Sequence, residues 1–247
     1  MKTLYKLTLI QTKLYLREPL GVFFSLLFAP LVLILFGSIY GNDPNPILNG
    51  RGSMDVSVPA YTGMIIGTVG LLGVPITTAA RRESGVLRRF RATPLRPLVY
   101  LLSDVLVYLV MTLLGILLLF LVGVAAYDVR FDGNLFSVLA GISLGTLTFL
   151  AIGYILAGLA PSARVAQVVG MVIFYPMMFL SGASIPLEIL PEGVQKFSRY
   201  LPLTHVVALL KGLWFGAGWG EHVAELGILV ALLAAGVLVS ARTFRWE

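Results

Sequence analysis

Residue types that carry chemistry in many proteins are missing or scarce in this sequence. There is no cysteine, which excludes disulfide bonds, thiol catalysis and thiolate metal sites. Only two histidines are present, His205 and His222, whereas a metal site needs three or four ligands. A phosphate-binding loop is also absent, because no lysine except Lys2 precedes Ser or Thr, and Lys2 has no upstream glycines. The sequence therefore shows no recognisable catalytic site and no cofactor-binding site.

Charge is scarce as well. Only 12% of the 247 residues are charged and 58% are hydrophobic, with a mean hydropathy of +0.92. A soluble domain typically has about 25% charged residues, so we interpret the chain as a polytopic membrane protein. The net charge of +6 would suggest a nucleic-acid partner in a soluble protein. Here an excess of basic residues in cytoplasmic loops accounts for it, and no nucleic-acid partner is expected.

Six apolar runs of 16 to 31 residues are close to or above the length of about 20 residues that crosses a bilayer. They predict spans at residues 20–40, 59–80, 97–127, 135–160, 165–180 and 222–241. The fold class is therefore an all-α integral membrane protein with one transmembrane domain over residues 1–247. Most of the 18 Lys and Arg residues lie on one side if the N-terminus is inside. The positive-inside rule then predicts a multi-pass protein of the cell inner (cytoplasmic) membrane with both termini cytoplasmic.

Two further segments flank or interrupt these spans. In residues 1–18 the basic side chains share one side of a helix and leucines lie on another, which predicts a helix lying flat in the cytoplasmic interface. Residues 181–221 alternate short apolar pieces with Gly, Pro and charge, and each piece is too short to cross. We expect this segment to form re-entrant helices that dip into the outer leaflet without crossing.

The most polar stretch, residues 81–96, lies between the second and third predicted spans and holds six of the 18 Lys and Arg residues. On a helix, Val86, Leu87 and Phe90 share one side and arginines cover the other. A helix from residue 82 to 92 is expected, ended by the proline that follows. On charge alone, an ordinary positive-inside loop fits equally well.

The order of residues in this stretch favours a more specific interpretation. Glu83-x-Gly85, followed by basic residues and then Thr93-Pro94, resembles the coupling segment of ABC-2 type (ABC exporter) permeases, most closely the drug-export branch. A second match, residues 179–191 followed by residues 200–205, looks like the S-G-x-x-x-P-L-x-x-x-P and N-P-L-T elements of those permeases, except that Leu201 replaces the usual Asn. The third match is the order of elements: an interfacial helix, two spans, a coupling helix and four more spans.

The resemblance implies a permease subunit that moves an amphipathic drug or lipid-like substrate outward. It implies that this chain binds no cofactor, and that ATP and Mg²⁺ act on a separate ABC ATPase (nucleotide-binding) subunit. A second permease copy, identical or paralogous, would enclose the substrate path, with the first and fifth spans near the interface. The implied ATPase-coupling residues are Arg82, Glu83, Gly85, Val86, Leu87, Phe90, Thr93 and Pro94. The implied outer-gate residues are Ser181, Gly182, Pro186, Pro191, Pro202 and Thr204.

Within this picture we expect the arginines of the coupling helix to face lipid headgroups or acidic ATPase residues. Val86, Leu87 and Phe90 would be its buried anchors on the ATPase. Glu83 would meet a basic or hydroxyl group there, or cap the helix start.

Alternatives remain open at this stage. The cargo could be a lipid-linked glycan or ions, or the protein could be a stand-alone ion-coupled carrier or channel, which would bury charges at mid-membrane. Asp104, about two turns into the third span, is the one expected intramembrane acid, and such residues are functional candidates by default. We favour a helix-end carboxylate near the cytoplasmic interface that pairs with a nearby Arg or hydroxyl.

Overall fold

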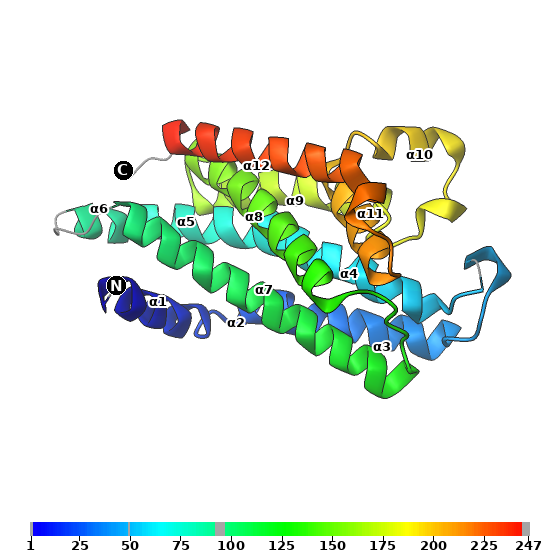
Figure 1. Cartoon of the computed structure of the whole chain (residues 1–247). Coiled ribbons are helices and arrows are strands. Elements are labelled where there is room, and N and C mark those ends of the chain that lie inside the picture. The colour runs from blue at the N-terminus through cyan, green and yellow to red at the C-terminus, as the bar shows by residue number, and fades with distance from the viewer. Residues whose placement is uncertain (1, 49, 92–96, 244–247) are drawn as a thin grey trace.

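A computed structural model describes residues 2–48, 50–91 and 97–243, and Figure 1 shows their arrangement. Within these ranges the chain is helical and contains no strand. The helices are α1 (Lys2–Tyr15), α2 (Pro19–Val22), α3 (Phe28–Tyr40), α4 (Ser53–Thr68), α5 (Val74–Glu83), α6 (Val86–Arg91), α7 (Pro97–Tyr127), α8 (Leu135–Leu159), α9 (Ala163–Leu180), α10 (Glu192–Ser198), α11 (Pro202–Trp214) and α12 (Val223–Thr243). Two π-helical segments, η1 (Phe23–Leu27) and η3 (Val69–Gly73), join α2 to α3 and α4 to α5.

Six of these helical stretches are long and apolar enough to cross a membrane. They are Phe23–Tyr40, Ser53–Glu83, Val99–Tyr127, Leu135–Leu159, Ala163–Leu180 and Trp219–Thr243. The predicted all-α membrane protein with six spans is thus confirmed. The second span is longer at both ends than the predicted 59–80, because its first turn is capped and its last turn carries arginines into the protein. At the first turn, the Asn42 side-chain oxygen accepts hydrogen bonds from the Met54 and Asp55 amides.

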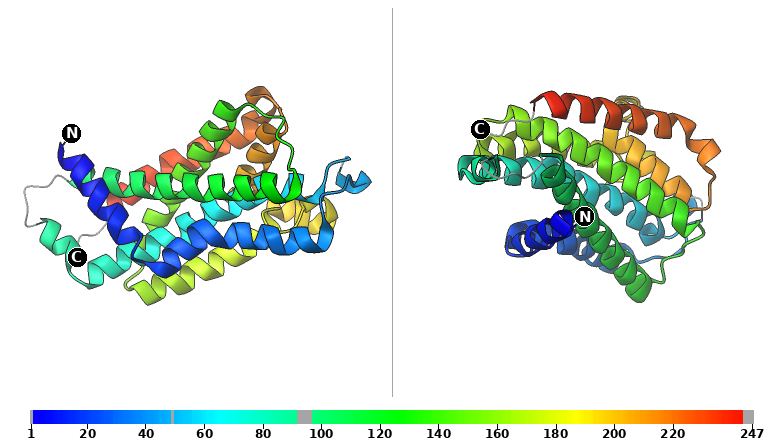
Figure 2. Two further views of the ribbon diagram at one scale, coloured as in Figure 1. Left: turned by 90° about the horizontal axis from the view of Figure 1, so that it is seen from below. Right: turned by 60° about the vertical axis from the view of Figure 1, so that its left-hand side comes forward.

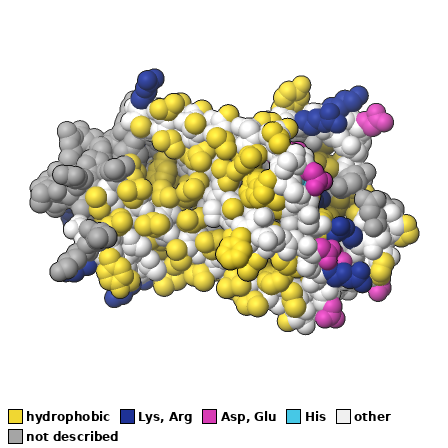
Figure 3. All heavy atoms as spheres, viewed as in Figure 1, with side chains coloured by type: hydrophobic (Ala, Val, Ile, Leu, Met, Phe, Trp, Pro, Cys, Tyr) yellow, Lys and Arg dark blue, Asp and Glu magenta, His cyan; other side chains and the backbone are white. Residues whose placement is uncertain are grey.

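The spans run side by side along the long axis of the molecule (Figure 1). One end carries α1, α5, α6 and the end of α12, and the opposite end carries α10 and the α7–α8 connection. Helix α1 lies obliquely across the start of α7 (Figure 2), where the Ser103 hydroxyl donates to the Gln11 side chain at 2.9 Å. The face shown in Figure 3 has a broad apolar band between its two ends, and charged side chains gather toward the ends. A bilayer would cover this band.

Helix α11 is the short helix of the predicted re-entrant segment. Its 13 residues extend about 20 Å, less than the roughly 30 Å of a bilayer core. It packs on α4 and α8 at glycines: a Cβ at Gly63 would lie 2.6 Å from Val207 Cγ2, and one at Gly141 would lie 2.9 Å from Leu213 Cδ1. Helix α11 is not among the six spans, and its depth in the outer leaflet stays a prediction.

The backbones of the second and fourth spans pack directly against each other at Gly153, so this position cannot accommodate a side chain. A Cβ at Gly153 would overlap the carbonyl oxygen of Gly70, a backbone atom that cannot rotate away. We expect Gly153→Ala to lower the free energy of unfolding by about 1–3 kcal/mol, the usual cost of overpacking. Thermal unfolding of the purified protein measures this. Gly227→Ala is the matched control, because no atom lies within 4 Å of its added Cβ. Equal midpoints for the two variants would contradict the close approach.

Candidate functional site

The predicted coupling helix is two helices rather than one. Helix α5 ends at Glu83, and α6 begins at Val86 after a turn at Ser84 and Gly85. Gly85 has φ +71°, a left-handed conformation that favours glycine and ends helices. The prediction of one helix from residue 82 to 92 is therefore wrong, because Gly85 breaks it. The positions of Thr93 and Pro94 lie outside the described residues.

Two of the arginines assigned to the outward side point into the protein instead. Arg82 donates to the Ala157 carbonyl at 3.0 Å and also to the Ala160 carbonyl. These carbonyls are at the end of α8, where helix carbonyls lack intrahelical partners and the helix dipole favours a cation. The expectation that Arg82 faces headgroups or the ATPase is therefore wrong. Its position at the end of the long second span brings it against α8.

Arg81 forms a buried ion pair with Asp104. Nη1 of Arg81 lies 2.7 Å from Asp104 Oδ1 and donates to the Tyr100 hydroxyl at 3.0 Å. Tyr154 donates its hydroxyl to the other oxygen of Asp104, also at 2.7 Å. The Asp104 side chain is only 2% exposed. The predicted pairing of Asp104 with a nearby Arg or hydroxyl is thus confirmed, and its position near the cytoplasmic interface stays a prediction. Its partners were missed, because Arg81 seemed to belong to the polar surface.

The remaining residues of the coupling segment divide into buried and accessible ones. Leu87 is fully buried and packs with Leu7 and Tyr100, so it is already covered within the chain and is not a free anchor for a partner. Glu83 is exposed and Val86 is half-buried. Phe90 lies on α6, although its side chain is outside the described set. Among the implied coupling residues whose side chains the structure describes, the exposed one is Glu83, at the turn between α5 and α6.

The residues assigned to an outer gate lie along the connection from α9 into α11. Ser181 is buried and its hydroxyl accepts a hydrogen bond from the Ala183 amide at 3.3 Å. Gly182 has φ +83°, so it too needs the freedom of glycine. Pro186 and Pro191 each precede a short helix, Pro202 begins α11, and Thr204 is buried in its first turn. Their role as a gate remains a prediction.

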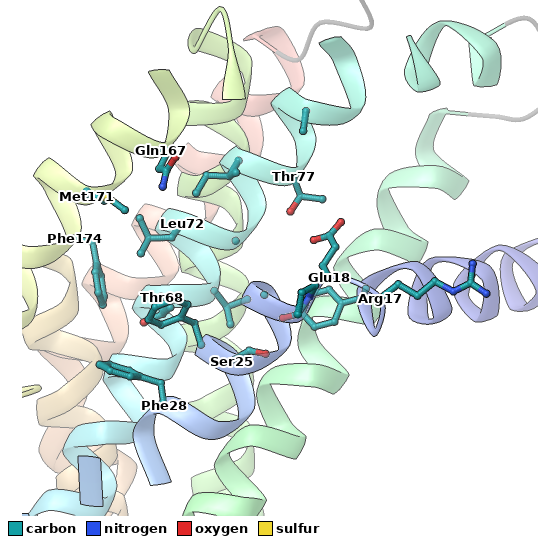
Figure 4. Close-up of a pocket in the computed structure, with 18 of the residues that line it drawn as sticks. Arg17, Glu18, Ser25, Phe28, Thr68, Leu72, Thr77, Gln167, Met171 and Phe174 are labelled. Atoms are coloured by element: carbon teal, nitrogen blue, oxygen red, sulfur yellow. The ribbon is translucent and has the colours of Figure 1, made fainter. Parts of the chain in front are cut away.

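A cavity of about 570 Å³ opens between the first, second and fifth spans (Figure 4). Its walls come from α2 and η1, from η3 and α5, and from α9. Most lining side chains are apolar or aromatic, and the polar ones that point toward it include Ser25, Thr68, Thr77 and Gln167 (Figure 4). This size and lining are typical of pockets that bind small molecules.

Both π-helical segments line this cavity. Phe24 and Ser25 come from η1, and Val69, Leu72 and Gly73 come from η3. A π-helical turn inserts an extra residue and is frequent at functional sites. Beyond η3, Pro75 has no amide hydrogen for the helical ladder, which helps to explain the irregular turn before it. The hydrophobic pattern of the sequence has no periodicity from which either π-helical segment could be predicted.

Glu18 connects the cavity to the buried ion pair. It lines the cavity mouth just before the first span, and Figure 4 shows its carboxylate pointing toward Thr77. Partial burial raises the pKa of the Glu18 carboxyl. The positive charge of Arg81 opposes this rise in pKa, the negative charge of Asp104 adds to it, and the hydrogen bond with Thr77 opposes it.

Comparison with known proteins identifies the family. The sequence model described as ABC-2 type transporter matches residues 3–215. The chain belongs to the ABC-2 type transporter family. It is 26% identical over 198 residues to the inner membrane transport permease YhhJ of Escherichia coli (strain K12), covering 76% of this chain and 52% of YhhJ. It is 30% identical over 104 residues to nodulation protein J of Rhizobium leguminosarum bv. viciae, covering 42% of this chain and 40% of that protein.

The chain thus spans about half the length, or less, of these curated relatives. The family match covers α1, the coupling segment and the cavity-lining spans, and it ends just after α11. The predicted resemblance to ABC-2 permeases is therefore confirmed, and the chain is a multi-pass membrane protein of this family.

Proposed function

We propose that this chain is the permease subunit of an ATP-driven ABC exporter that moves an amphipathic, drug-like or lipid-like substrate outward. The observation that carries the proposal is the apolar cavity between the first, second and fifth spans. Its lining includes Tyr15 of α1 and Thr77 and Ala80 of α5, so it lies toward the end of the molecule that carries these helices. An exporter needs such a site near the side from which it takes its substrate.

The distribution of basic residues supports an orientation in the cell inner membrane. The end with α1 and α6 carries most of the Lys and Arg residues, so we place it, with both termini, in the cytoplasm. YhhJ, whose name describes an inner membrane permease, supports the same compartment. ATP and Mg²⁺ would then act on an ABC ATPase subunit bound at this end, and this chain would hold no cofactor.

Exposed apolar faces beside the cavity support a second permease copy. The first and fifth spans expose large hydrophobic side chains, including Phe24, Leu27, Val172 and Tyr175, of which Phe24 and Tyr175 also line the cavity. An identical or paralogous permease packed on these two spans would close the open side of the cavity. The substrate path would then run between the two copies.

The buried charges give no support to a stand-alone ion-coupled carrier. Arg81 and Asp104 neutralise each other at 2.7 Å, and both lie near one end of their helices rather than at mid-membrane. In the described residues no three His, Asp or Glu side chains gather where they could hold a metal ion. The pair therefore has the geometry of a structural contact, not of an ion path.

Co-purification tests the proposal. Affinity-tagged permease, extracted in a mild detergent from its native host, should retain an ABC ATPase identified by mass spectrometry. We expect equal numbers of permease and ATPase subunits and a mass that fits two of each. A permease that purifies without an ATPase under these conditions would reject the proposed exporter. One permease per two ATPase subunits would reject the permease dimer.

A further inference from the structure

The cavity between the first, second and fifth spans is lined by one positive and one negative side chain that point in different directions. Only two charged residues line it among those described, Arg17 and Glu18. In Figure 4 the Arg17 guanidinium extends away from the cavity along α1, whereas the Glu18 carboxylate points toward Thr77. Glu18 is partly buried but keeps enough exposed surface for a molecule in the cavity to reach it. The charge directed at the cavity is therefore negative.

The cation whose charge acts on this carboxylate is already engaged. Arg81 acts on Glu18 through its charge, but its Nη1 atom is 2.7 Å from Asp104 and also donates to Tyr100. Glu18, Asp104 and Arg81 together place two carboxylates beside one guanidinium. One further positive charge would balance this group, and the cavity is the open side from which it can arrive.

The remaining walls suit a hydrophobic body that carries such a charge. Phe24, Phe28, Phe174 and Tyr175 contribute aromatic rings, and Met171 contributes a polarisable thioether. Aromatic faces attract cations, and methionine adapts to ligands of varied shape. A volume of about 570 Å³ accommodates a molecule of drug size.

We propose that this cavity binds a hydrophobic organic cation and that Glu18 is the residue that selects its positive charge. The inference rests on the proposed permease function and adds to it the chemical class of the cargo. A carboxylate beside an apolar wall attracts a cation more strongly than it would in water and repels an anion. A neutral molecule of the same shape gains only the apolar contacts.

The titration of Glu18 gives the proposal a pH dependence. The groups that face Glu18 are Tyr15 from α1, Thr77 and Arg81 from α5, and Asp104 from α7. Because burial raises the pKa of Glu18, its carboxyl stays protonated to a higher pH than usual. Cation binding should strengthen as pH rises through this pKa and weaken as pH falls below it, because the protonated carboxyl carries no charge.

Equilibrium dialysis of the purified permease in detergent tests the selection of charge. Tetraphenylphosphonium and tetraphenylborate are matched in size and apolar surface but opposite in charge. We expect the cation to bind at least about tenfold more tightly than the anion, and Glu18→Gln to lose about tenfold for the cation alone. The matched control is Glu192→Gln, an exposed glutamate on α10 at the opposite end. Equal affinity for both ions, undetectable cation binding, or an unchanged cation affinity in Glu18→Gln would overturn the proposal.

A chemical measurement keeps the test decisive if Glu18→Gln folds poorly. The chain has no native cysteine, so Met171→Cys places a single thiol in the cavity. Its rate of modification is measured with a trimethylammonium methanethiosulfonate and with a sulfonate analogue. The ratio of the two rates in the protein, divided by the same ratio for a free thiol in solution, should be about ten. A corrected ratio of one would overturn the proposal.

These measurements use the permease alone and can fail separately from the proposed function. A permease that retains its ATPase but shows no preference for cations would reject only the inference about cargo. A permease that prefers cations but purifies without an ATPase would reject the exporter.

Discussion

Asp104→Ala is expected to destabilise the protein more than Gly153→Ala does. The change leaves the Arg81 guanidinium buried without its carboxylate and removes the acceptor of the Tyr154 hydroxyl. Breaking one partner of a buried ion pair costs about 3–5 kcal/mol, because an uncompensated charge stays in the interior. Fluorescence-detected size exclusion of heated, detergent-purified protein measures the loss as a lower midpoint of thermal unfolding.

Two companion variants separate this cause from a general loss of packing. Asp132→Ala removes an exposed carboxylate that lies 3.8 Å from Arg51, and such surface pairs contribute about 0–1 kcal/mol. The double variant Arg81→Met with Asp104→Leu removes both charges and should recover much of the lost stability. A double variant no more stable than Asp104→Ala would contradict the explanation by an unpaired charge.

Substitutions at the α5–α6 turn are expected to have the largest effect on transport. Glu83 is exposed at this turn and Phe90 lies on α6, so we expect both to contact the ATPase. Phe90→Ala should weaken association by about 2 kcal/mol, or roughly thirtyfold, as loss of an aromatic interface anchor does. Glu83→Ala should lower ATPase association and transport together. The matched control is Glu192→Ala, on α10 at the opposite end.

Leu87 is expected to behave differently from Glu83 and Phe90. It packs on Leu7 and Tyr100, and the Tyr100 hydroxyl receives a hydrogen bond from Arg81. Movement of α6 would pass through these contacts to α1, α7 and the second span. Leu87→Ala should therefore keep ATPase association but lower the transport obtained per ATP hydrolysed. Loss of association in Leu87→Ala, with none in Phe90→Ala, would contradict this division of roles.

The six spans could be predicted from the sequence because hydropathy alone indicates which segments are apolar enough to enter the bilayer. The ends of the helices could not be predicted in the same way. Arg81 and Arg82 stand in the most basic stretch of the chain, yet they extend the second span and bond to α7 and α8. A charge pattern shows which residues prefer water, but it does not show which of them have a buried partner elsewhere in the chain.

The cavity could not be predicted from the sequence for a related reason. Glu18 and Met171 line one cavity although they are far apart in the chain, and only the folded arrangement of the first, second and fifth spans brings them together. The π-helical turns at η1 and η3 lie inside uniformly apolar runs, where one extra residue leaves no trace in the pattern. Residues 81–96 could be singled out as the expected coupling segment because Glu83, Gly85 and Thr93-Pro94 keep a recognisable order, although the break at Gly85 was not predicted.

The most direct test of the central claim is ATP-dependent transport in inverted membrane vesicles that contain the permease and its ATPase. Uptake of a labelled hydrophobic cation should require ATP, stop with vanadate, and fall in Glu83→Ala and Phe90→Ala while the permease remains inserted at wild-type levels. Uptake that continues without ATP, is insensitive to vanadate and is unchanged in both variants would contradict the assignment of this chain as the permease of an ATP-driven exporter.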